Sequence, residues 1–191
     1  MQIPAISAIL LFVASGALAQ APIERGTATA SFKGKQVTID YGRPALKGRT
    51  VNELTAKLPP DRIWRAGADR VTTLTTEGDI LIGDKKVPAG KYTLYVHIPT
   101  AGAWSLVINT DPGIELAKLW PAAPPEVAKT TYPRLDGYQK NIADKEVARV
   151  PMKSGTVATV VELFTITLDP QGVLTMLWGD RSWSVDVKPA P

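Results

Sequence analysis

The sequence predicts a mostly β protein, an antiparallel β-sandwich or partly open barrel of jelly-roll type with one or two short helices. Apolar and polar residues alternate along several short segments, as they do in strands with one buried face. Turn signals rich in glycine, proline and aspartate separate these segments. Many short strands joined by such turns are typical of sandwiches and barrels.

The first half of the chain supplies most of the predicted strands. In the segment 36–42 (QVTIDYG), Val37, Ile39 and Tyr41 share one face and are expected to point into the core. The segment 104–109 is expected to pair with 91–98 across the bend at 99–103. The predicted strands of this half are 36–42, 71–76, 79–83, a short strand before the Pro-Ala-Gly turn, 91–98 and 104–109.

The C-terminal half is predicted to hold three more strands. Segments 159–169 and 172–178 flank a Pro-Gln turn, and 182–187 follows a turn at Gly179-Asp180-Arg181. In the last of these strands, Trp183 and two valines alternate with polar residues. Helix signals are few: residues 50–58 are expected to form two turns before Pro59-Pro60, and 140–149 could form a second short helix.

A proline-rich segment at about 119–141 interrupts the strand pattern. Prolines at positions 121, 124, 125 and 133 disfavour a central strand and predict an excursion over the surface. Such a loop can be a lid, a partner surface or a tolerated insertion, and the last of these is favoured because most loop length carries no site.

The N-terminal residues 1–19 have the pattern of a secretory signal peptide. Residues 6–13 are apolar but too few to span a bilayer, and Ala17-Leu18-Ala19 fits a small-residue cleavage site. Residues 20–191 are then expected to be one β domain, periplasmic or secreted, without a membrane span. The chain has no cysteine, so its stability must come from the core rather than from disulfides.

The composition argues against several classes of function. The chain has 22 Lys and Arg against 18 Asp and Glu, a net charge of +4 that is spread along the sequence. Nucleic-acid binding needs a clustered basic face, so no nucleic-acid partner is expected. One histidine and no cysteine argue against zinc sites, and the motifs of common catalytic families are absent. No cofactor, metal site or catalytic residue is therefore expected.

Two glycine-marked bends gather the candidate binding residues. In YGRPALKGR, Pro44 restricts the backbone and Gly48 permits a left-handed turn, so Arg43 and Arg49 can flank one compact bend that also contains Lys47. An arginine fork there would suit a carboxylate or phosphate. The alternative is a surface turn with solvated charges, since exposed ion pairs contribute little.

The segment IWRAGADRVT carries the strongest candidates. Trp64 offers an amphipathic ring, Arg65 a fixed cation and Asp69 a hydrogen-bond acceptor. Glu162 has the same parity as Phe164 in its strand, so it is expected to face inward, where a carboxylate needs a partner. A buried pair between Glu162 and Arg65 that only holds the strands in place is favoured over a pair that lines a ligand pocket.

The order of motifs along the chain resembles an exported bacterial family, the domain of unknown function 2911. The segments that carry the resemblance are TIDYGRPALKGR, IWRAGADRVTTL, DILIGDKKVPAGKYTLYVHIP, WSLVIN, ARVPM and VELFTITL. The resemblance extends from about Thr27 onward and implies a compact, mostly β, extracytoplasmic domain without an established activity. The chain departs from the family pattern at Asp69-Arg70 and in a longer proline-rich segment after Trp120. The matching positions are Gly42, Arg43, Pro44, Lys47, Gly48, Arg49, Trp64, Arg65, Gly67, Ala68 and Glu162.

Three hypotheses for the function follow. The first is a non-enzymatic binding module for a small anionic or polyhydroxy, carbohydrate-like ligand, with Arg43 and Arg65 on the charge and Trp64 as a stacking wall. The second is a hydrolase that uses Asp69 and Glu162 as a carboxylate pair, as glycosidases do. The third is an envelope scaffold or interaction protein without a pocket, in which the proline-rich loop makes the contact.

The predicted signal peptide gives the first testable expectation. If the signal is cleaved after Ala19, the exported protein begins at Gln20. N-terminal sequencing and intact mass of the exported protein check this. Exported protein that retains Met1 would show that the apolar segment is not a cleaved signal.

Overall fold

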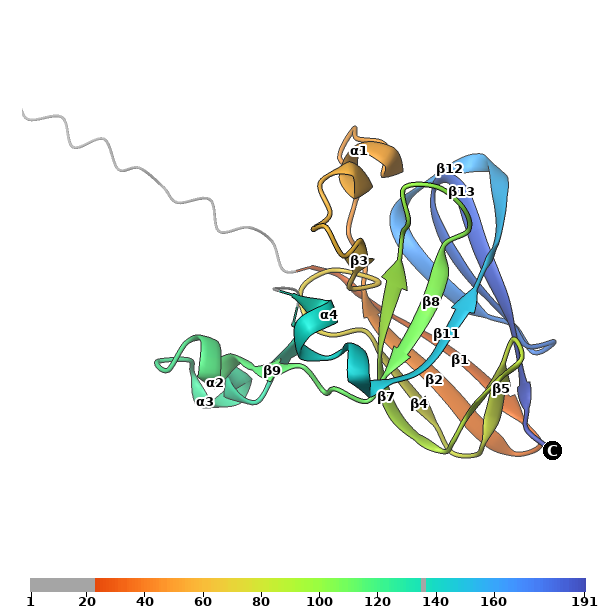
Figure 1. Ribbon diagram of the computed structural model, residues 1–191, viewed down its shortest axis with the longest axis horizontal. Coiled ribbons are helices and arrows are strands. Elements are labelled where there is room, and N and C mark those ends of the chain that lie inside the picture. The colour runs from red at the N-terminus through yellow and green to blue at the C-terminus, as the bar shows by residue number, and fades with distance from the viewer. Residues whose placement is uncertain (1–22, 135–136) are drawn as a thin grey trace, which may run out of the picture.

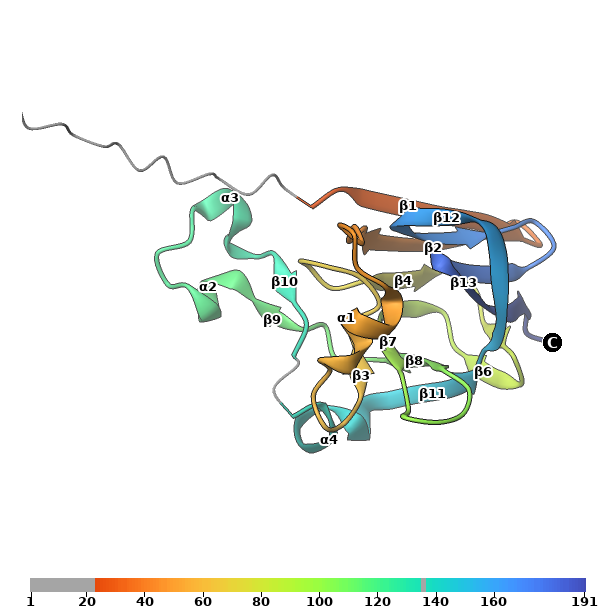
Figure 2. The same ribbon diagram turned by 90° about the horizontal axis from the view of Figure 1, so that it is seen from above.

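The fold is a sandwich of two antiparallel sheets (Figures 1 and 2). The computed structural model describes residues 23–134 and 137–191, so the predicted signal peptide lies outside the described residues. Strands hold 51% of the residues and helices 13%, and the sheets do not close into a barrel. The predicted mostly β class and sandwich architecture are confirmed.

The first sheet is built mainly from the first half of the chain, and its last strand arrives from the far side of the proline-rich segment. Neighbouring strands in it are antiparallel. Its order is β1 (Arg25–Phe32), β2 (Lys35–Gly42), β4 (Thr73–Thr76), β7 (Gly90–His97), β8 (Ser105–Asn109) and β11 (Glu146–Pro151), with β3 (Ile63–Trp64) paired to the end of β7.

The second sheet faces the first and is dominated by one long hairpin. Its order is β12 (Lys153–Leu168), β13 (Val173–Pro189), β5 (Ile80–Ile82) and β6 (Lys85–Val87). The predicted turn between β12 and β13 is confirmed, because the N–H of Gly172 donates to the carbonyl of Asp169 at 3.0 Å. The chain passes directly from β11 of the first sheet into β12 of the second.

The core lies between the sheets, and the strand faces predicted from alternation are confirmed there. The apolar residues predicted to point inward are nearly inaccessible to solvent, whereas their sequence neighbours are more exposed. They are Val37, Ile39 and Tyr41 in β2, Phe164, Ile166 and Leu168 in β12, and Trp183, Val185 and Val187 in β13.

Helices are short, and the second of the two predicted helices is confirmed only in part. The helix α1 (Val51–Ala56) confirms the prediction for 50–58, and Thr50 and Glu53 cap it reciprocally. The segment 140–149 instead ends α4 (Tyr138–Asn141), makes a 3-10 turn (Ala143–Lys145) and becomes β11. Pairing with β8 outweighs weak local helix propensity there. In the described ranges, no helix is long and apolar enough to cross a membrane.

The predicted turn at Gly179-Asp180-Arg181 is wrong. The chain remains in β13 through these residues, and Gly179 takes a left-handed φ of 64°. The pairing with β12 is irregular on both sides of Gly179. The extra residues of this irregular pairing lie in β12, and Gly179 lies opposite them within a continuous strand rather than at a reversal of the chain.

The proline-rich segment leaves the sandwich between β8 and β11 and projects to one side (Figures 1 and 2). It is not featureless, because β9 (Ile114–Glu115) and β10 (Thr131–Tyr132) pair with each other. Two single-turn helices, α2 (Leu116–Leu119) and α3 (Pro125–Ala128), lie between those strands. We refer to residues 110–145 as the excursion.

The two glycine-marked bends predicted to hold the site meet backbone to backbone. A Cβ atom added to Gly42 would fall on the carbonyl oxygen of Ala68, closer than any real contact allows. A Cβ added to Gly67 would lie 2.9 Å from the Gly42 carbonyl oxygen. The glycines of the two motifs thus allow the two loops to touch, close in sequence to Trp64 and Arg65.

We therefore expect Gly42→Ala to lower the free energy of unfolding by about 1–3 kcal/mol, as overpacking does, because the added methyl group must displace main chain. Gly78→Ala is the control, since a Cβ there meets only the flexible Lys35 side chain, and its effect should stay within about 0.5 kcal/mol. Urea denaturation measures both. Equal stabilities of the two variants would contradict the close approach of the two loops.

Candidate functional site

The first predicted bend lies along the edge of the second sheet. Leu46 donates its N–H to the Glu162 carbonyl at 3.0 Å, and Phe164 donates to the Pro44 carbonyl at 2.9 Å. A β-bridge also joins Ala45 to Leu163. The chain that leaves β2 of the first sheet is thus hydrogen-bonded to β12, and it helps to connect the two sheets.

The arginines of this bend use their N–H groups for contacts with other residues of the protein. The Arg43 guanidinium donates to the Phe164 carbonyl at 3.3 Å and to the Thr165 hydroxyl at 3.1 Å, and it pairs with Glu24. Arg49 donates through Nε to the Leu46 carbonyl at 2.8 Å. These contacts favour a structural role for Arg43 and Arg49 over the predicted anion grip.

Glu162 does not face inward as predicted. Its side chain is exposed, and its carboxylate accepts the N–H of Lys47 at 2.8 Å instead of meeting Arg65. The pairing of β12 with β13 is irregular between Thr156 and Thr165, so strand parity established at Phe164 does not extend back to Glu162. The expected buried pair with Arg65 is therefore wrong.

Asp69 points toward the base of the excursion. Its residue takes a left-handed φ of 64°, and its carboxylate lies 3.7 Å from Nε of Arg70. Burial, followed by the charge of Asp69 and a hydrogen bond with it, raises the pKa of the Tyr132 hydroxyl in β10. Asp69 and Glu162 contact different segments, and neither lines the pocket described next.

Trp64 and Arg65 line a pocket between α1 and the open end of the sandwich. Its volume is about 240 Å³. Trp64 stacks on Trp178 with ring centroids 5.3 Å apart and meets Phe164 edge-on at 4.9 Å. The lining is mostly apolar and comprises Pro44, Leu54, Thr55, Leu58, Pro59, Ile63, Trp64, Arg65, Gly67, Ala68 and Trp178. We call it the Trp64 pocket.

Arg65 is the only charged residue among the described lining residues of the Trp64 pocket. It is partly buried, and it makes no hydrogen bond or ion pair with any residue in the ranges 23–134 and 137–191. A partly buried guanidinium normally finds a carboxylate or a carbonyl. Of the residues expected to form one site, Trp64 and Arg65 line this pocket, and one face of Trp64 is already covered by Trp178.

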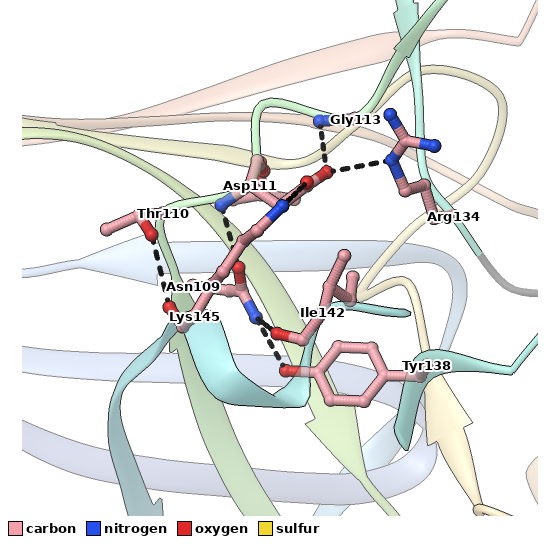
Figure 3. Close-up of polar contacts among 9 residues, drawn as sticks. Asn109, Thr110, Asp111, Gly113, Arg134, Tyr138, Ile142 and Lys145 are labelled. Carbon is pink, nitrogen blue, oxygen red and sulfur yellow. Dashed lines mark hydrogen bonds and ion pairs between the residues drawn. The ribbon is translucent and has the colours of Figure 1, made fainter. Parts of the chain in front are cut away.

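A second polar cluster, which the sequence does not predict, is centred on Asp111 (Figure 3). The Asp111 side chain is only 2% exposed, yet it binds two cations: Oδ1 lies 3.3 Å from Nε of Arg134 and Oδ2 lies 2.9 Å from Nζ of Lys145. The N–H of Gly113 also donates to Oδ1 at 2.9 Å. The local signal, NTDPG after a strand, resembles any turn and does not identify these partners.

Asn109 extends this cluster at the end of β8. Its side-chain amide donates to the Tyr138 hydroxyl at 3.0 Å and to the Ile142 carbonyl at 2.8 Å. Tyr138 in turn packs edge-on against Tyr95, with centroids 5.0 Å apart. Together, Asn109 and Asp111 tie both ends of the excursion to the first sheet. In the part of the chain that the structure describes, no three His, Cys, Asp or Glu side chains are grouped to hold a metal.

The charge state of Asp111 follows from this arrangement. Burial alone would raise the pKa of its carboxyl group, but the Lys145 ammonium, the Gly113 N–H and the Arg134 guanidinium outweigh burial and hold the pKa below its ordinary value. A carboxyl group with a lowered pKa in the folded state stabilises the protein above its unfolded pKa, and the stabilisation is lost as the pH falls through the folded value.

Asp111→Asn is expected to lower the free energy of unfolding at pH 7 by about 2–3 kcal/mol, less than for a fully buried pair, because Arg134 and Lys145 can rehydrate. The deficit should shrink below about pH 4, where the unfolded wild-type carboxyl becomes protonated. Denaturation curves at several pH values measure it. Asp144→Asn, at an exposed position, is the control. A deficit that does not depend on pH would show that the carboxylate charge is not the stabilising element.

Comparison with known proteins places the chain in a family. The searches of curated proteins and of solved structures found no match. The profile of the family described as "Protein of unknown function (DUF2911)" matches residues 24–187, which is nearly the whole described chain. This agrees with the resemblance that the motifs indicate, and the matched range includes both the Trp64 pocket and the Asp111 cluster. The chain belongs to the DUF2911 family of proteins of unknown function.

Proposed function

We propose that this protein is a non-enzymatic binding domain for a small anion with an apolar body, held in the Trp64 pocket. The observation that carries the proposal is Arg65, an unpaired cation beside an aromatic and aliphatic wall. The guanidinium would bind a carboxylate of the ligand, and the apolar body would lie between α1 and the Trp64–Trp178 pair. Hydrogen bonds to charged groups contribute about 1.5–3 kcal/mol each.

The size of the pocket supports a ligand of about one ring. A dry cavity of about 150 Å³ already accepts benzene, and the Trp64 pocket has about 240 Å³. Drug-sized ligands occupy pockets of about 300–1,000 Å³, so the ligand proposed here is smaller than those. An aromatic or short branched aliphatic carboxylate fits this range.

The lining favours such a ligand over a carbohydrate. Thr55 carries the one side-chain hydroxyl in the described lining, and that hydroxyl already donates to the Asn52 carbonyl at 3.3 Å. A polyhydroxy ligand would leave most of its hydroxyl groups without partners, which costs free energy on burial. Among the two ligand classes expected from the sequence, the anionic one is therefore proposed.

The other two hypotheses have less support. Asp69 and Glu162 contact different segments and do not border a common pocket in the described lining, so a carboxylate-pair hydrolase lacks its two groups there. An interaction role is supported by Leu119 and Trp120, whose side chains are about half exposed on the excursion. From the signal-like residues 1–19, we further propose that the domain acts in the periplasm or after secretion.

Benzoate is the probe that tests the proposal. We expect benzoate to raise the melting temperature of the folded domain in a saturable way, as a ligand of the native state does. Benzyl alcohol, which has the ring without the charge, and acetate, which has the charge without the ring, should both bind more weakly. Arg65→Gln should weaken benzoate binding by about 10-fold or more, as loss of a charged hydrogen bond implies, and leave benzyl alcohol unaffected.

Arg70→Gln is the matched control, because Arg70 carries the same charge five positions away and does not line the pocket. Its affinity for benzoate should stay within about twofold of wild type, since an exposed charge contributes little. Absence of saturable binding by the wild-type domain would contradict the proposed function. Equal losses in Arg65→Gln and Arg70→Gln would contradict the assignment of Arg65.

A further inference from the structure

Arg134 and Lys145 border a second pocket, distinct from the Trp64 pocket, at the base of the excursion. Its volume is about 550 Å³, and its lining comprises Ile114, Leu119, Pro133, Arg134, Asn141 and Lys145. No acidic residue is among these described lining residues, although Asp111 lies directly behind the two cations. The pocket therefore presents positive charge on one wall and apolar side chains on the other.

Anchoring to Asp111 leaves most donors of the two cations available. Arg134 uses Nε for Asp111, and its two Nη groups, which have no partner among the described residues, point away from that carboxylate in Figure 3. Lys145 uses one of three N–H groups for the same carboxylate. The side chains of Arg134 and Lys145 are 37% and 44% exposed, so solvent and ligands can reach them.

We propose that this pocket binds a phosphate group. Asp111 anchors a planar guanidinium through one oxygen and an ammonium through the other, and both cations line the same pocket. The guanidinium fork suits two oxygens of a phosphate, and the ammonium suits a third. A carboxylate has two oxygens and would be satisfied by the fork alone. Among the described residues of this cluster, one carboxylate against two cations also leaves a net positive charge to be neutralised.

The arrangement is preorganised for such a ligand. Surface cations usually lose side-chain freedom when they bind, which lowers affinity. Here the buried carboxylate has already fixed one atom of each cation, so less freedom remains to be lost. The apolar wall of Ile114, Leu119 and Pro133 would contact the organic part of a phosphate ester.

Inorganic phosphate is the first probe, added to the isotope-labelled folded domain at constant ionic strength so that screening does not change. Saturable shifts of the amide signals of Gly113, Ile114 and Lys145, without shifts at Trp64 and Arg65, are expected. Shifts confined to Arg65 would assign the anion to the Trp64 pocket and overturn this second site. The same shifts with chloride, or with acetate at equal or higher affinity, would overturn the assignment to phosphate.

Arg134→Lys tests the fork, because a lysine there keeps the charge and can keep the ion pair with Asp111. We expect phosphate affinity to fall about 10-fold or more in this variant, since bidentate contacts are lost. Lys145→Arg, which retains a cation and its donors, should bind within a few-fold of wild type. Lys140→Gln removes an exposed cation of α4 that does not line the pocket. An equal loss in Lys140→Gln and Arg134→Lys would show nonspecific attraction and overturn the proposal.

Two further probes distinguish the sources of the phosphate group. Glycerol phosphate represents a soluble ester, and phosphatidic acid in neutral phosphatidylcholine vesicles represents a lipid headgroup. Binding of glycerol phosphate without cosedimentation with the vesicles assigns a soluble ester, and cosedimentation that Arg134→Lys abolishes assigns a headgroup. If neither binds, the proposal is wrong. Benzoate binding through Arg65 is measured separately, so failure of one site does not decide the other.

Discussion

Two pairs of stacked indole rings join the two sheets of this cysteine-free chain. Trp64 lies on Trp178 with centroids 5.3 Å apart, and Trp104 lies on Trp183 at 4.0 Å, each pair within 9° of parallel. The partners on the second sheet, Trp178 and Trp183, both belong to β13, so one strand carries both contacts. Aromatic pairs contribute about 0.5–1.5 kcal/mol each beyond the area they bury. Together with the apolar faces between the sheets, they do what a disulfide does in many exported domains: they fix how two layers face each other.

The Trp64–Trp178 pair also forms part of the wall of the proposed ligand pocket and makes that wall rigid. Trp64 cannot turn away, because Trp178 covers one face and Phe164 packs against it in a T-shaped contact. Arg65 follows directly in the chain, and the turn after it, at Gly67 and Ala68, lies against the main chain of Gly42. A site whose wall also belongs to the core offers a preformed surface, which reduces the ordering cost of binding. Because Trp64 and Trp178 both line the pocket and connect the two sheets, a substitution in this wall also affects the packing between the sheets.

The sequence predicts the structural features that depend only on residues close together in the chain. Alternation identified the buried faces of β2 and β13, because a strand with one buried face shows this in its own residues. Trp64 and Arg65 are candidates from local sequence alone, because an aromatic ring and a cation precede a glycine turn there. The same parity rule failed at Glu162, where irregular pairing in β12 breaks the period. The Asp111 cluster cannot be predicted from local sequence, because its two cations lie 23 and 34 positions further along the chain. Only the folded excursion brings those charges to one carboxylate.

The excursion begins and ends on strands that are direct neighbours, since Asn109 of β8 is paired with Glu146 of β11. In topology it is an enlarged hairpin loop, and its two ends would lie side by side whatever its length. The entropy of closing a loop grows only with the logarithm of its length, by about 0.6 kcal/mol for each doubling. Insertions or deletions between these strands therefore change the stability of the sandwich little as long as the two ends stay anchored. Chains with the same sandwich can differ greatly in what they carry at this point, and the excursion is where a new specificity can arise without a new fold.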